Sequence, residues 1–184
     1  LYGGNNASNA DVVNQINAGV GVVAYRGHGS NTAWQAWNGG HFSFENSGIQ
    51  NGDRTPVVFS IACSNLAMQD EARSHGEQWM LANNGGAAAF LGATIPSWTE
   101  ANDVFMQMIF RILLDDGVSR IGALIDRARV AILSQGFNRA NEAVDNVRMY
   151  AWLGDPMMDI GTTFEKAPEV RVGWCNLQWP PQME

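Results

Sequence analysis

The sequence GVVAYRGHGS, residues 21–30, contains an apolar run that ends in a histidine between glycines. It begins as an apolar run of small and β-branched residues, which is typical of a strand buried on both faces of a sheet. It then changes character at Tyr25 and Arg26 and ends in a histidine held between two glycines. A histidine packed in a core needs no such neighbours, whereas glycines let a backbone approach a ligand closely. We therefore expect a strand that presents His28 at its carboxyl end.

Two more apolar stretches predict strands, TPVVFSIACS at 55–64 (strand over 57–62) and GAAAFLGAT at 86–94. Helical periodicity and stop signals separate and follow them. The expected helices lie at 10–19, 75–83, 99–117 and 119–136, the third with a stripe of Val104, Met108, Ile112 and Leu113, the last with Ser119 as N-cap and Gly136 as stop. The aromatic-rich stretch at 30–48 is expected to be a loop, and 141–160 a short helix with a strand-like end broken by Gly-Asp-Pro.

This alternation of strands and helices predicts an α/β domain with a mostly parallel sheet flanked by helices. The 184 residues suffice for one domain with its own core. We expect the domain to span residues 1–160, followed by an irregular Pro-rich tail at 161–184.

Composition narrows the class of protein. Hydrophobic residues make up 46% and charged residues 16%, which indicates a globular chain. The 18 acidic against 11 basic side chains, a net charge of −7, argue against nucleic acid or anionic membrane as the main partner. No apolar run reaches the roughly 18 residues that a membrane span needs. The low charge and the many Gly, Asn and Ser residues favour a secreted or cell-surface protein.

Two of the predicted strands end in reactive side chains, His28 and Cys63. Because the carboxyl ends of parallel strands meet at one edge, neighbouring strands would bring both side chains together there. A thiol needs a nearby imidazole to become a good nucleophile near neutral pH. The backbone N–H groups of Gly29 and Cys63 would then form an oxyanion hole. The alternatives are that Cys63 is a small buried hydrophobe and that His28 is a turn residue.

The stretches GVVAYRGHGSNTAW and TPVVFSIACSN together resemble the gingipain-type cysteine peptidases. In that family a hydrophobic strand ends in Gly-His-Gly and a later one in Ala-Cys. The resemblance continues through GEQWMLANNGGAAAFLGATIPSW at 76–98 and MYAWLGDPMMDI at 149–160, so that it covers residues 11–160.

The resemblance implies a caspase-like three-layer sandwich and a cysteine endopeptidase that works through an acyl-thioester. It implies Cys63 as nucleophile, His28 as general acid/base, and Gly29 and Cys63 as oxyanion donors. Trp98 matches a tryptophan that lines the S1 pocket of the family, with plain packing as the alternative reading. A polypeptide is the implied substrate.

The gingipain family has a part of its catalytic domain that precedes the region similar to this sequence. Gingipains carry an N-terminal subdomain that supplies the acid orienting the histidine and the charge of the S1 pocket, whereas only 27 residues precede His28. The sequence starts at Leu1 rather than at a methionine, so we expect a processed product or part of a longer protein. We therefore expect an upstream subdomain or a second chain to pack here, and do not carry over the preference for basic residues. No cofactor is expected to be required; calcium as a structural ion is implied by the family, without matched ligands.

Other interpretations remain open. The same dyad would serve a sortase-like transpeptidase, and a non-catalytic domain of this fold would bind a partner through Trp34, Trp37, Phe42 and Phe44. The three histidines with Cys63 lack the spacing of a zinc site. His41 and His75 are expected to be solvated or loop residues, and Cys175 is assigned no role.

Overall fold

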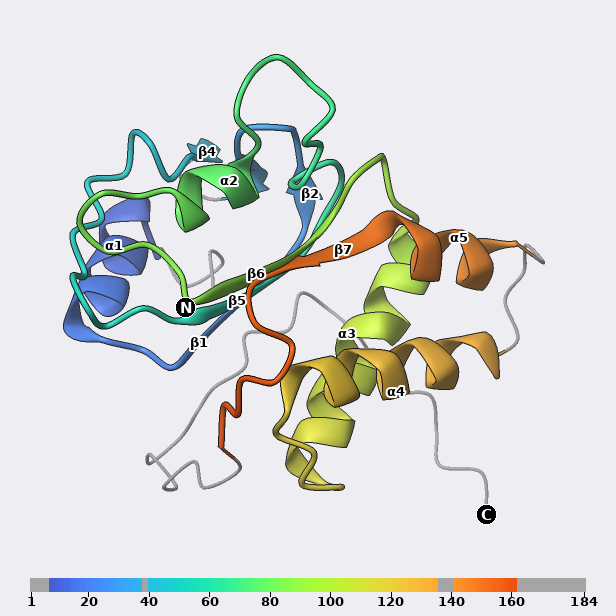
Figure 1. The fold of residues 1–184 in the computed structure, drawn as a ribbon. Coiled ribbons are helices and arrows are strands. Elements are labelled where there is room, and N and C mark those ends of the chain that lie inside the picture. Colours follow the sequence, from blue (N-terminus) through green and yellow to red (C-terminus); the bar gives the residue numbers. More distant parts are fainter. Residues whose placement is uncertain (1–6, 38–39, 136–140, 162–184) are drawn as a thin grey trace.

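The computed structural model describes residues 7–37, 40–135 and 141–161. These ranges contain five helices and seven strands, and Figure 1 shows their arrangement. The helices are α1 (Asn9–Ala18), α2 (His75–Met80), α3 (Thr99–Leu114), α4 (Ile121–Leu133) and α5 (Glu142–Met149). The strands are β1 (Val22–Arg26), β2 (His28–Gly29), β3 (Trp34–Trp37), β4 (Gly40–Phe42), β5 (Val57–Ile61), β6 (Ala89–Ala93) and β7 (Tyr150–Leu153). No helix of these ranges is long and apolar enough to cross a membrane.

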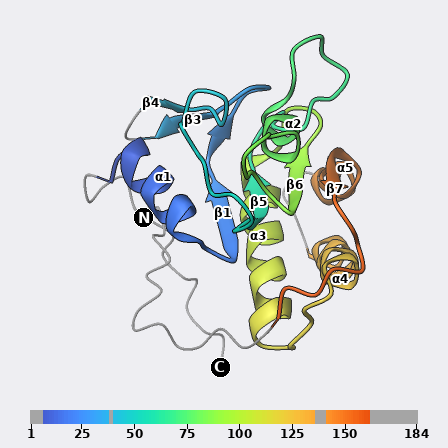
Figure 2. The same cartoon turned by 60° about the vertical axis from the view of Figure 1, so that its left-hand side comes forward.

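The main sheet has four strands in the order β1-β5-β6-β7, which Figure 2 shows from left to right. β1, β5 and β6 run parallel, and β7 pairs antiparallel with β6. The central strands β5 and β6 are buried along their whole length, whereas β1, at the edge, is only partly covered. The predicted α/β class with a mostly parallel sheet is confirmed.

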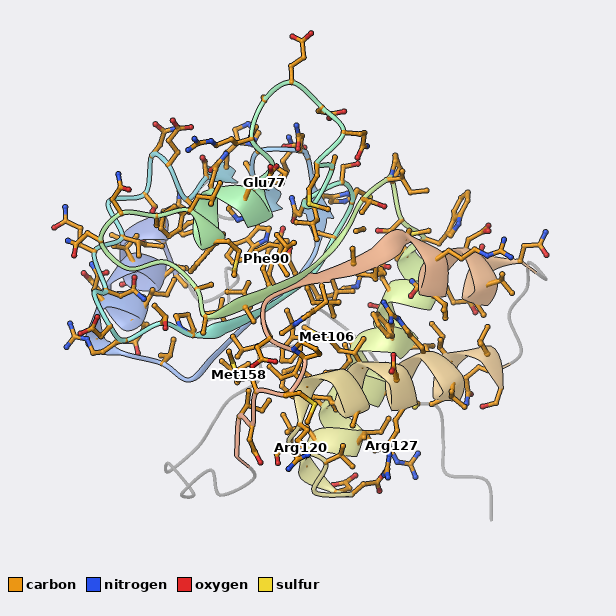
Figure 3. All side chains as sticks on the ribbon, viewed as in Figure 1. Glu77, Phe90, Met106, Arg120, Arg127 and Met158 are labelled. Carbon is orange, nitrogen blue, oxygen red and sulfur yellow. The ribbon has the colours of Figure 1, made fainter. Side chains whose placement is uncertain are left out.

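Helices cover both faces of the main sheet and give three layers (Figure 1). Alternation along β5 sends Val57, Phe59 and Ile61 into the core shared with α3, α4 and α5, and Val58 into the opposite core with α1 and α2. Figure 3 shows the same division, with Phe90 on the α2 side of the sheet and Met106 on the α3 side.

Local sequence explains the helix ends. Ser8 caps α1 and Ser74 caps α2, each in a reciprocal capping box, with Asp11 and Glu77 respectively. The expected Ser119 cap is wrong, because α4 starts after Arg120, which makes no side-chain cap. Gly136 lies outside the described residues.

The buried face of α3 also differs from the expected stripe. It is formed by Ala101, Asn102, Phe105, Ile109, Ile112 and Leu113, while Val104 and Met108 are only partly buried. Apolar residues cover a wide arc of this helix. The part of the arc that packs against α4 and the sheet is rotated by about one residue from the predicted stripe.

The expected loop at 30–48 contains part of a second sheet, of order β2-β3-β4. Its strands are antiparallel, with Gly29 paired to Trp34 and Trp34 paired to Phe42. Trp34 stacks between Tyr25 at 4.5 Å and Phe42 at 5.1 Å between ring centroids. These strands have two to four residues, too few to reveal alternation, and aromatic packing holds them together.

Candidate active site

His28 and Cys63 follow neighbouring parallel strands at the same edge of the main sheet. β1 and β5 are paired in register from Val22 opposite Val57 to Arg26 opposite Ile61. His28 and Cys63 each come two residues after the last pair of this register. The sequence-based expectation that the two strands are neighbours is therefore met. His28 is exposed and Cys63, a free thiol, is half-buried.

Gly29 brings the backbone of the histidine loop against the cysteine. A Cβ atom built on Gly29 would lie 2.5 Å from the Cys63 carbonyl oxygen and 3.0 Å from the Ala62 Cβ. Real Cβ atoms do not approach a backbone oxygen so closely, so this position requires a glycine. The glycine after the histidine thus permits contact between the two strand ends.

Asn65 connects the loop after His28 to the turn after Cys63 by hydrogen bonds. Its Nδ2 donates to the carbonyls of Ser30 at 2.6 Å and Ala33 at 3.1 Å. Its Oδ1 accepts from the Ser60 hydroxyl at 2.7 Å, and Ser60 in turn accepts from the Trp34 indole at 2.8 Å. The side chain of Asn65 is fully buried, so these hydrogen bonds form in a low-dielectric interior. They fix the loop after His28 to the turn after Cys63.

The backbone turns sharply after the cysteine. Ser64 has a φ of 54° and is the one non-glycine residue with a positive φ in the described ranges. Its N–H donates to the Ile95 carbonyl at 3.2 Å, and the Leu66 N–H donates to the Ala93 carbonyl at 2.9 Å. Left-handed non-glycine residues are uncommon and concentrate at functional sites. The turn packs Cys63 against the loop that leaves β6.

That loop surrounds the sulfur with groups of Ser97. The Ser97 N–H lies 3.4 Å and the Ser97 hydroxyl oxygen 3.7 Å from the Cys63 Sγ, and both can donate to it. The thiol can itself donate to the Ser97 carbonyl at 3.6 Å. Cys63 therefore has hydrogen-bond partners in both its thiol and its thiolate form.

Trp98 follows Ser97 and stands at the start of α3. Its side chain is 40% exposed, and Ile95 in the same loop is 48% exposed, so an apolar surface lies beside the cysteine. Arg26, at the end of β1, fixes this loop: its Nε contacts the Asp103 carboxylate at 2.6 Å and its Nη2 donates to the Thr99 carbonyl at 3.1 Å.

This geometry can be compared with known proteins. A model of peptidase family C25 matches residues 1–161 of the chain. The chain belongs to peptidase family C25. The resemblance read from the Gly-His-Gly and Ala-Cys motifs is thereby confirmed.

Solved structures of similar fold include gingipains. The crystal structure of the Arg-specific cysteine proteinase gingipain R (RgpB) matches with a TM-score of 0.72 and 20% identity, over 83% of this chain and 36% of that one. The complex of Porphyromonas gingivalis RgpB pro- and mature domains matches with a TM-score of 0.70 and 20% identity, over 82% of this chain and 36% of that one. A structure described only as a protease gives a TM-score of 0.63 at 16% identity, over 79% of this chain and 36% of that one.

These matches confirm the caspase-like fold for this C25 member. The chain spans about a third of the length of the solved chains that it matches. None of the curated proteins compared with the chain matches it.

One histidine of this C25 chain was placed wrongly from its sequence. His75 is fully buried at the start of α2, where its Nε2 accepts from the Trp79 indole at 3.1 Å. Aromatic rings of Trp34, Phe42, Trp79 and Phe90 surround it. Burial lowers the pKa of His75 to about 3, and a backbone interaction with Thr32 opposes this shift only in part. His75 is thus a neutral core residue, whereas His41, on β4, is exposed as expected.

The sequence interpretation also missed the residues that support the site. Asn65, Ser97 and Asn102 were assigned no role, although each contacts the loops of His28 or Cys63 or their neighbours. One signal was available: Asn102 is a polar residue on the otherwise apolar face of α3. Asn65 and Ser97 gave none, because short polar residues after a strand are ordinary turn residues.

Several expectations stay predictions. The boundary between a domain at 1–160 and a tail at 161–184 is untested, and Cys175 lies outside the described residues. Calcium as a structural ion is also untested. Within 7–37, 40–135 and 141–161, no three His, Cys, Asp or Glu side chains gather as a metal site would need.

Proposed function

We propose that this C25 chain carries the His/Cys part of a cysteine endopeptidase. The observation that carries the proposal is the in-register pairing of β1 and β5, which brings the backbones after His28 and Cys63 together at one sheet edge. An exposed imidazole and a half-buried free thiol at such an edge are the groups that thiol-dependent acyl transfer needs.

The proposed reaction has two stages. The proton of the Cys63 thiol passes to the His28 imidazole, and the sulfur forms a bond to the carbonyl carbon of the scissile peptide. The C–N bond then breaks, and the leaving amine takes the proton from His28, which leaves an acyl-thioester on Cys63. Water next attacks the thioester with His28 as base, and the S–C bond breaks to return the thiol and release the acid.

Backbone donors would stabilise the negative oxygen of each tetrahedral intermediate. We assign this role to the N–H groups of Gly29 and Cys63, because Gly29 lies against the Cys63 backbone. In the described part of the chain, no acceptor for the Cys63 N–H is found among the backbone hydrogen bonds of turns and loops. Trp98 is proposed to line the pocket for the residue before the scissile bond, which its 40% exposure beside the Ser97 loop permits.

The substrate is proposed to be a polypeptide, without an assigned preference for the side chain in that pocket. Asp103, in the first turns of the helix that follows Trp98, forms an ion pair with Arg26. Asp103 is therefore a support of the Trp98 loop in this proposal rather than a receptor for a cationic side chain.

We further propose that a companion segment or chain completes the enzyme and that the protein acts outside the cytoplasm. Among the solved structures similar to this chain is a complex of the pro- and mature domains of RgpB, which supports a companion domain. The reaction as written needs no cofactor. A structural calcium ion would stabilise the fold and take no part in the reaction.

The proposal is tested with a library of quenched fluorescent peptides and the purified chain, alone and with any companion segment. We expect peptide cleavage that Cys63→Ala and His28→Ala abolish, while both variants keep the circular dichroism spectrum of the parent. Mass spectra of the products, with and without an added amine, separate hydrolysis from transpeptidation. Cleavage that survives Cys63→Ala would overturn the assignment of the nucleophile.

A further inference from the structure

A buried polar chain runs from the cysteine into the helical layer behind the sheet. The Ser97 hydroxyl oxygen, 3.7 Å from the Cys63 Sγ, accepts a hydrogen bond of 2.7 Å from the Asn102 Nδ2. The Asn102 Oδ1 accepts from the Tyr150 hydroxyl at 2.8 Å and from the Asn146 Nδ2 at 3.0 Å. This series of hydrogen bonds thus links α3, α5 and β7 to the sulfur.

The hydrogen-bonded side chains behind the sulfur are buried among apolar residues. Asn102 is 3% exposed, Tyr150 1% and Asn146 0%, and all three adjoin an otherwise apolar core. Burying polar groups there contributes little net stability, since each lost its bonds to water. A hydrogen-bonded network in a low-dielectric interior holds its members in one arrangement, so this cluster can fix the group at its open end.

The hydrogen bonds determine which atom faces the serine. Two donors converge on the Asn102 Oδ1, so the amide must turn its Nδ2 toward Ser97. The Ser97 oxygen then acts as acceptor from Asn102 and keeps its own proton for another partner. Tyr150 remains a donor, because burial raises the pKa of its phenol far above neutrality.

We propose that Ser97 is a further catalytic residue, whose hydroxyl donates to the Cys63 thiolate and is aimed there by Asn102. The Ser97 N–H, at 3.4 Å, is a second donor to the same sulfur. Both stabilise the charge that appears on sulfur when the thiol proton moves to His28 and that is consumed when the S–C bond forms. Tyr150 and Asn146 are positioning residues. The inference rests on the proposed function, since it concerns ionisation of the proposed nucleophile.

The other titratable and charged groups near the site come from four elements. They are His28 on β2, Arg26 on β1, which is paired with Asp103 of α3, and Tyr150 on β7, whose phenol interacts electrostatically with both Cys63 and Arg26. A change in the ionisation of Cys63 must therefore be assigned to Ser97 by substitution rather than from one pH profile alone.

The test measures the rate at which iodoacetamide alkylates Cys63 between pH 5 and 10, with peptide mass mapping to separate Cys63 from Cys175. We expect Ser97→Ala to move the midpoint of the rate profile to higher pH and to lower the rate at pH 7 about three- to tenfold. Ser97→Thr, which keeps a hydroxyl, should restore the profile. The matched control is Ser134→Ala at the exposed end of α4, which should leave it unchanged.

Tyr150→Phe should move the profile in the same direction by a smaller amount, because Asn102 keeps one of its two donors. It also supplies a second variant should Ser97→Ala fail to fold. A folded Ser97→Ala protein with the parental profile would overturn the inference and would mean that the Ser97 hydroxyl donates to Asn102 or Tyr150 instead. Because alkylation needs no substrate, the two outcomes are separable: a protein that cleaves no peptide even with its companion segment but shows the shift would refute the proposed function and leave only the hydrogen bond from Ser97 to the sulfur established.

Discussion

Gly29 contributes to the candidate site through the side chain that it lacks. Its position, where a Cβ would lie 2.5 Å from the Cys63 carbonyl oxygen, makes the contact between the two strand ends intolerant of any substitution. The proposed oxyanion donors belong to these same two residues, so their spacing depends directly on this contact.

We predict that Gly29→Ala lowers kcat/KM about a hundredfold, because a displacement near 1 Å at a catalytic group costs that much. Gly21→Ala is the matched control, since a Cβ built on Gly21 meets nothing within 4 Å. Peptide cleavage by the two variants checks this, with melting temperatures to confirm folding. Equal activity of the two would show that the loop of His28 can move away from Cys63 without cost.

The sequence predicted His28 and Cys63 because each stands at the end of an apolar strand, and Gly29 because it follows the histidine. Ser97 and Asn102 escaped prediction for a physical reason. Their part depends on hydrogen bonds across 34 and 44 positions, to Cys63 and from Asn146, which no local pattern contains. His75 was misplaced because a histidine after a capping serine is ordinarily exposed, and only the aromatic core above α2 removes it from water.

The loop after β1 and the turn after β5 act as one element because Asn65 holds them. Its amide donates to two carbonyls of the first segment and accepts from Ser60 of β5. The Asn65 carbonyl oxygen also accepts from the Gly76 N–H of α2 at 2.8 Å, a backbone bond that substitutions of the side chain leave in place.

We predict that Asn65→Ala lowers the free energy of unfolding by about 2–4 kcal/mol, because it removes the side-chain donor from the Ser30 carbonyl and the acceptor from the buried Ser60 hydroxyl, while the Ala33 carbonyl keeps the Ser30 N–H. Asn83→Ala, in the exposed loop after α2, should change it by less than about 0.5 kcal/mol. Urea titration followed by circular dichroism measures both. A loss below 1 kcal/mol in Asn65→Ala would show that the two loops hold together without this amide.

At the element scale, prediction worked where one segment carries its own signal. Helical periodicity and stop signals mark α1 and α2, and continuous apolar runs mark β5 and β6. It failed at β2, β3 and β4, which are short and depend on the stacking of Tyr25, Trp34 and Phe42. Their pairing partners, like the antiparallel direction of β7, follow from the assembled fold.

Stability of the whole molecule should depend on pH through His75. The folded state holds this imidazole neutral, with a pKa of about 3 against 6.5 for an ordinary histidine. Below pH 6.5 the unfolded chain therefore binds a proton that the folded chain refuses, and unfolding is favoured as pH falls. The effect ends near pH 3, where the folded state also takes up the proton. The lowered pKa values of Asp11 and Asp159 add to it only below about pH 4.

We predict that the free energy of unfolding falls between pH 6 and 4 with a slope that His75 increases by up to about 1.4 kcal/mol per pH unit. His75→Gln, which cannot titrate, should lack this part of the slope. Urea titrations at several pH values compare the two proteins, and the NMR signal of the His75 ring provides a check without substitution. Parallel slopes, or a ring that titrates near pH 6, would contradict the buried neutral state.

At the scale of the whole molecule, alternating strands and helices were enough to predict an α/β fold, because few architectures satisfy that order. The same reasoning placed His28 and Cys63 at one edge, since parallel neighbours end together. It did not predict the roles of Ser97 and Asn102, because the packing of α3 and α5 against β7 depends on several segments that lie far apart in the sequence.

Selective labelling of the two cysteines shows whether Cys63 is a nucleophile activated by His28. The folded protein is treated with a limiting amount of a peptidyl acyloxymethyl ketone near pH 7, and peptide mass mapping locates the label. We expect modification of Cys63 ahead of Cys175, and loss of that preference in a His28→Ala protein that retains the parental circular dichroism spectrum. Equal labelling of the two cysteines, or labelling of Cys63 that His28→Ala leaves unchanged, would contradict it.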